Sequence, residues 1–158
     1  MIQEFLWLFF LFWVVWIIGA VGHELFHGLA CYLQGAKFKI SIWFHEITIG
    51  KRKFKVPSMQ CSPEGDMKNN DLFYYLGGVG LGGFFILLSV LVFFFSQPLF
   101  IVLFLIGCAH FFYGLYEGMF IGKLDLETYM IWHYLVYVIG IAIGALVIRG
   151  RIYEYIFG

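Results

Sequence analysis

Two histidines and a glutamate with a spacing that suits metal chemistry lie at residues 23–27, which read His-Glu-Leu-Phe-His. On a helix, residues four apart share a face, so the imidazoles of His23 and His27 can bind the same ion. Glu24 would then lie beside that ion, in the position of a general base for a bound water. Imidazole and carboxylate ligands suit Zn²⁺, although iron and manganese accept them as well. The motif therefore predicts a zinc site that can carry out hydrolysis.

A metal held by two histidines needs a further protein ligand, and two acidic residues are candidates. Asp125 follows the third apolar segment and, by the count of membrane crossings, falls on the same side and at a similar depth as His23 and His27. Glu117 lies inside that segment, where a lone carboxylate is costly and is usually functional. His110, seven residues earlier, shares the helix face of Glu117 and is either a ligand or a buried histidine that pairs with it. Asp125 and Glu117 both stay open as the third ligand.

The composition is typical of an integral membrane protein. Of the 158 residues, 62% are hydrophobic and only 13% are charged, which is too few charges to cover a soluble domain of this size. The formal net charge is zero, so there is no electrostatic reason to expect nucleic acid as a partner. Cys31, Cys61 and Cys108 are scattered and form no CxxC pair, so we expect neither a disulfide framework nor a thiolate zinc site.

Four apolar segments are each long enough to cross the hydrocarbon core of a bilayer, which takes roughly 20 residues. Because lipid offers no partners for backbone N–H and C=O groups, all four should be helical. The predicted fold class is an all-α membrane protein with four transmembrane helices and a small membrane-surface β-sheet between helices one and two. We expect one membrane-embedded core over residues 1–158, with helices at about 5–33, 72–95, 99–121 and 129–148.

The loop between the first two helices carries the predicted sheet, over residues 36–57. Polar and apolar residues alternate over 37–42, and the stretches 46–49 and 53–56 are similar, with Gly50 between them as a turn. Pro57 and Pro63 predict irregular chain after the sheet. The whole loop holds seven of the ten Lys and Arg residues, so the positive-inside rule places it, and the nearby metal site, on the cytoplasmic side.

In three places the chain resembles the site-2 proteases, a family of intramembrane zinc metalloproteases. The first is Gly22-His-Glu-Leu-Phe-His-Gly28 on a first core helix, the second is the glycine-rich run Leu76–Gly83, and the third is Leu124-Asp125 after the third helix. In the family, an Asn lies eight residues before this Asp and a Gly follows it. Here Glu117 and Leu126 occupy those two positions.

The resemblance implies a ligand set and an activity. His23, His27 and Asp125 would bind zinc, and Glu24 would be the general base that activates a zinc-bound water. The enzyme would hydrolyse a peptide bond of a membrane-associated or transmembrane substrate near the cytoplasmic face. The expected partners are that substrate and the lipid bilayer, in what we expect to be a prokaryotic cell membrane. Two alternatives stay open: a membrane hydrolase for a lipid amide or ester, and a degenerate, non-catalytic metal-binding protein that captures membrane peptides.

Overall fold

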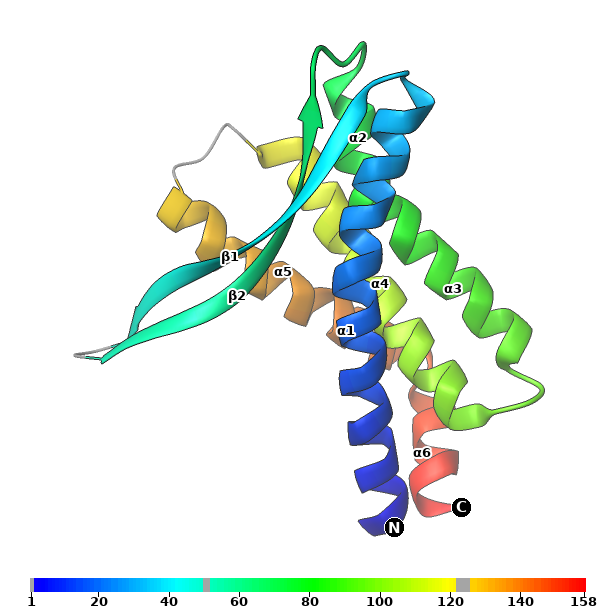
Figure 1. Cartoon of the computed structure of the whole chain (residues 1–158). Helices are drawn as coiled ribbons and strands as arrows, with labels where there is room; N and C mark the ends of the chain where they lie inside the picture. The colour runs from blue at the N-terminus through cyan, green and yellow to red at the C-terminus, as the bar shows by residue number, and fades with distance from the viewer. Residues whose placement is uncertain (1, 50–51, 122–125) are drawn as a thin grey trace.

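The computed structural model describes residues 2–49, 52–121 and 126–158. Its other helices pack around helix α4 (Gln97–Phe120), which lies at the centre of the bundle (Figure 1). Helix α1 is followed by a hairpin of two strands, a short helix that continues through a π-helical turn into the next helix, and three further helices. In chain order the elements are α1 (Ile2–Leu33), β1 (Lys37–Ile49), β2 (Arg52–Glu64), α2 (Asn70–Tyr75), η1 (Leu76–Gly80), α3 (Leu81–Val92), α4 (Gln97–Phe120), α5 (Leu126–Val147) and α6 (Arg149–Phe157).

Within the described residues, three helical segments are long and apolar enough to cross a membrane, and they confirm the first three predicted spans. They are Ile2–Leu33, Asn70–Val92 and Gln97–Phe120. The predicted fourth span does not stand alone: Trp132–Val147 and Arg149–Phe157 pass the same test only as a pair bent by 74°. The bend puts three charged residues, Arg149, Arg151 and Glu154, on the separate short helix α6. The chain is therefore a mostly helical membrane protein with three such helices, or four if the bent pair is one span.

The hairpin confirms the predicted antiparallel sheet and is longer than expected. Its pairing runs from Lys37 opposite Glu64 to Ile49 opposite Arg52. Near its base, one face of the sheet packs on α1, where the ring of Phe38 lies against Gly28. Figure 1 shows the hairpin leaving the end of α1 and extending to one side of the helices.

The prediction of irregular chain at Pro57 and Pro63 is wrong, because both residues lie inside β2. Each strand of a two-stranded sheet keeps one free edge, and a proline facing that edge removes no hydrogen bond of the ladder. The N–H of Cys61 shows which way the free edge lies, since it donates to Glu24 of α1. Alternate residues of a strand direct their N–H groups to the same side, so both prolines share the outward direction of Cys61.

Helix α4 is the centre of the bundle. On one side it packs with α1 and α3, through Val102, Leu103 and Ile106 against Val15, Leu81 and Phe85. On another side it packs with α5, through Ala109, Tyr113 and Tyr116 against Tyr137. The glycine-rich run predicted close helix contact, and Gly78 indeed lies against the backbone of Gly114, where a Cβ would not fit. This contact brings the π-helical turn η1 directly onto α4.

Candidate metal centre

His23 and His27 lie on one face of α1 and direct their Nε2 atoms toward each other. The two nitrogens are 3.0 Å apart. Both side chains are buried, with 6% of His23 and 3% of His27 exposed. The helical spacing alone dictates this convergence, because residues four apart lie one above the other on a helix.

Glu117 of α4 brings a carboxylate to the same point. Its Oε2 atom lies 3.2 Å from Nε2 of His23 and 3.5 Å from Nε2 of His27. A four-coordinate ion with bonds of about 2.0–2.1 Å holds its ligand atoms about 3.3–3.4 Å apart. The three separations match that spacing, so His23, His27 and Glu117 form a buried group that can hold one metal ion.

The hydrogen bonds of His27 favour a cation at this point. Its Nδ1 lies 2.7 Å from the carbonyl oxygen of Phe73, an oxygen that can only accept, so Nδ1 carries the proton. In the neutral ring, Nε2 then presents a lone pair toward the carboxylate of Glu117. Among the described residues, Nδ1 of His23 has no hydrogen-bond partner, and Oε2 of Glu117 has only the two imidazole nitrogens beside it. Either a metal ion or a proton on Nε2 of His23 would relieve the repulsion between these lone pairs, and a histidine fixed by a backbone carbonyl is the usual arrangement of a metal ligand.

The turn η1 makes room for the ring of His27. A Cβ on Gly77 would overlap that imidazole, so only glycine fits at this position. The π-helical turn widens the helix between α2 and α3, and such turns are frequent at functional sites. Phe73 on α2 also stacks on the ring, with centroids 4.4 Å apart. The segment from α2 to η1 therefore fixes both the position and the orientation of His27.

Glu24 is held beside the metal group by the hairpin. The backbone N–H of Cys61 donates to Oε2 of Glu24 at 2.5 Å. The carboxylate of Glu24 points toward β2, although Glu24 directly follows His23 in the chain. The carboxylate of Glu117 points instead to the two histidines. The two carboxylates therefore have separate environments, one facing a backbone donor and one facing the imidazoles.

The other residues singled out from the sequence have different positions. Asp125 lies outside the described residues, so the structure does not place it. His110 is buried and its Nδ1 lies 3.3 Å from the Tyr137 hydroxyl, while its ring packs 5.8 Å from that of His23. It therefore packs behind the metal group and is not part of it. His133 of α5 packs its ring against Tyr113.

Sequence reasoning missed the backbone partners of this site. Neither the Phe73 carbonyl nor the Cys61 N–H leaves a signal in residue types, because every residue except proline has both groups. The glycine-rich run did indicate that another part of the chain packs closely against this segment. It did not indicate that the ring of His27 is what packs against Gly77.

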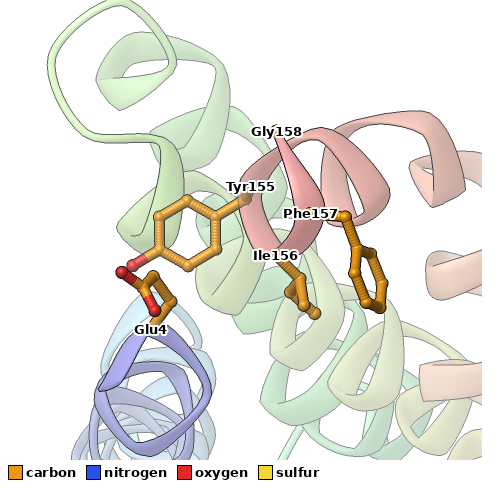
Figure 2. Close-up of a pocket in the computed structure, with 5 residues that line it drawn as sticks. All are labelled: Glu4, Tyr155, Ile156, Phe157 and Gly158. Atoms are coloured by element: carbon orange, nitrogen blue, oxygen red, sulfur yellow. The ribbon is translucent and has the colours of Figure 1, made fainter. Parts of the chain in front are cut away.

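A hollow of about 410 Å³ lies at the other end of the molecule (Figure 2). It is lined by Glu4 of α1 and by the last four residues of the chain, including Tyr155. Glu4 precedes His23 by 19 residues, which is about 28 Å along a helix. This hollow is therefore too far away to admit a substrate to the metal group.

Comparisons of the chain with protein-family models, with curated proteins and with solved structures gave no match.

Proposed function

We propose that this protein is an intramembrane zinc metallopeptidase that hydrolyses a peptide bond of a membrane-associated or transmembrane substrate, as its resemblance to the site-2 proteases implies. The observation that carries the proposal is the convergence of His23, His27 and Glu117 inside a bundle of membrane-length helices. Buried ionisable groups in a membrane are costly and usually functional. Three neutral or anionic nitrogen and oxygen ligands in a tetrahedral spacing suit zinc best.

In this proposal His23, His27 and Glu117 are the protein ligands, and Glu24 is the general base. Zinc, when bound, would lower the pKa of a water molecule toward neutrality and polarise the carbonyl group of the substrate. Glu24 accepts a proton from the water as the C–O bond forms, and passes it to the amine as the C–N bond breaks. The Cys61 N–H already donates to Oε2 of Glu24, so we propose that Oε1 is the atom that accepts the proton from the water and returns it to the amine.

We further propose that the substrate pairs as an extended strand with the free edge of β2. A helical segment hides its carbonyl groups, so it must unwind before hydrolysis, and strand addition stabilises the extended form. Between the prolines at 57 and 63, Met59 and Cys61 have outward N–H groups, and because that of Cys61 already donates to Glu24, the N–H of Met59 is the one that a substrate strand can use. This short window lies beside Glu24, so a paired strand would pass next to the general base.

The excess of basic residues in the hairpin and its flanks supports a cytoplasmic position for this end of the bundle. We therefore place the site toward the cytoplasmic face of what we take to be a prokaryotic cell membrane. Accessibility labelling of a cysteine introduced at Lys68, which is exposed, would test this orientation in spheroplasts. Labelling from outside the cell would contradict it.

The decisive experiment compares Glu24→Gln with the unchanged protein after reconstitution in lipid vesicles. We expect the variant to keep one zinc ion per chain and to cleave a panel of transmembrane peptides about 10²–10⁴-fold more slowly, because only the proton acceptor is lost. Glu4→Gln is the matched control, since it removes an acid from the same helix about 30 Å away. Equal cleavage by Glu24→Gln and the unchanged protein would refute the assignment of the base.

A parallel panel of lipid amides and esters separates this proposal from the other candidate functions. Hydrolysis of a lipid in place of the peptides would identify a lipid hydrolase. Bound zinc without turnover of either panel would identify a binding protein without catalytic activity. Either result would overturn the peptidase proposal and leave the metal site intact.

A further inference from the structure

Three sulfur atoms meet on the side of α1 next to the hairpin. Cys31 of α1 donates from its thiol to the Met67 thioether, with the sulfurs 3.8 Å apart. The Cys31 and Cys61 thiols also interact with each other within one buried cluster. Both cysteines are buried, with 0% of Cys31 and 4% of Cys61 exposed, and they share an apolar cluster with Phe73. The three sulfurs come from a helix, a strand and the segment between β2 and α2, so only the fold brings them together.

We propose that Cys31, Cys61 and Met67 form a second metal site, which binds the soft monovalent cation Cu(I). Thiolate and thioether ligands favour soft metals, which include Cu(I), zinc and iron–sulfur clusters. With metal–sulfur bonds of about 2.3 Å, a trigonal ion holds its sulfurs about 4 Å apart, close to the observed 3.8 Å between Cys31 and Met67. Structural zinc sites have four ligands, so three sulfurs fit a zinc site less well.

Disulfide exchange at Cys31 and Cys61 would be slow in the folded protein. Burial raises the pKa of the Cys61 thiol to about 12, so its thiolate is scarce at neutral pH and exchange with another disulfide is slow. Binding of Cu(I) instead replaces the proton on each thiol, and two protons are released for each ion bound. The buried, apolar surroundings of the two thiols also suit a soft cation that needs few ligands.

The proposed copper site is separate from the His23, His27 and Glu117 group and does not depend on the peptidase proposal. Cys31 lies one helical turn beyond His27, and the backbone of Cys61 holds Glu24. An ion bound here would join β2 to α1 at the residue that positions Glu24. Copper would then stabilise the hairpin in the arrangement that the structure shows.

The test is a competition between the purified full-length protein in detergent and a chromogenic Cu(I) chelator, under ascorbate. We expect one Cu(I) per chain, and at least about a 100-fold weaker affinity in Cys31→Ser and Cys61→Ser. The matched control Cys108→Ser changes the buried cysteine of α4 outside the cluster and should stay within about threefold of the unchanged protein. Binding lost in Cys108→Ser, or kept in Cys31→Ser, would overturn the proposal.

X-ray absorption of the unchanged copper-loaded protein tests the same proposal without relying on the folding of variants. We expect three sulfur neighbours and no nitrogen or oxygen neighbour. A shell that contains imidazole nitrogen, or protein that takes up no Cu(I), would refute the sulfur site. Neither result would affect zinc binding at the histidines, which is measured separately.

Discussion

Gly77 makes the sharpest test of the metal centre, because its substitution removes no ligand. It lies in η1 against the ring of His27, whose Nδ1 donates to the Phe73 carbonyl. We expect Gly77→Ala to weaken zinc binding by displacing that ring. The neighbouring Gly78 is packed on the backbone of Gly114, so η1 has no room to move away from α1 instead.

The size of the effect follows from the contact distances. A Cβ on Gly77 would lie 2.7 Å from Nδ1 of His27 and closer still to two other ring atoms, whereas ordinary contacts begin at 3.4 Å. The ring must therefore shift by at least about 0.7 Å, and a metal ligand tolerates only about 0.2 Å. We expect at least about a 100-fold loss of zinc affinity, equivalent to about 2.7 kcal/mol.

The assay is a zinc titration of the purified protein against a chromogenic indicator, with thermal unfolding measured alongside. Gly83→Ala is the matched control, since Gly83 belongs to the same glycine run and a Cβ there would meet no atom within 4 Å. The control should bind zinc as the unchanged protein does. If Gly77→Ala remains folded and its zinc affinity stays within about threefold, His27 is not a ligand in the geometry described here.

Three further predictions address the third ligand, the edge of β2 and the buried thiol. Glu117→Gln should lower the zinc affinity at least about 100-fold, whereas Asp125→Asn should change it less than about threefold. A zinc titration that shows the reverse order would assign the third ligand to Asp125. Met59→Pro removes an outward N–H of β2 and leaves the hydrogen bonds between β1 and β2 in place. The kcat/KM for a membrane peptide should therefore fall while the zinc content stays the same. Unchanged cleavage would exclude strand addition at this edge. Because the pKa of Cys61 rises from its ordinary 9.0 to about 12 in the fold, iodoacetamide should label it about a thousandfold more slowly at pH 8 in native protein than in denaturant. The native rate should grow about tenfold per pH unit up to that pKa, and peptide mapping that finds equal labelling in both states would show that the thiol is not buried.

Much of the framework could be predicted from the sequence because it depends on local spacing. The three apolar segments correspond to the helices α1, α2–α3 and α4, since their length and composition alone decide whether they can cross a bilayer. The alternation over residues 37–42 identified the hairpin, because a strand directs neighbouring side chains to opposite faces. Prolines 57 and 63 misled the prediction, since the sequence does not show that β2 has a free edge on that side.

What the sequence by itself determined is the pair His23 and His27 with Glu24 between them, because a helix turns any such spacing into one shared face. Tertiary packing alone decided that Glu117 completes the group, that Phe73 and Gly77 fix the ring of His27, and that Cys61 holds Glu24. These partners lie between 37 and 94 residues away along the chain from the residue they meet, and no local pattern reports such a contact. They meet because glycines let α4 and η1 approach backbone to backbone, and because the apolar face of the hairpin packs onto α1.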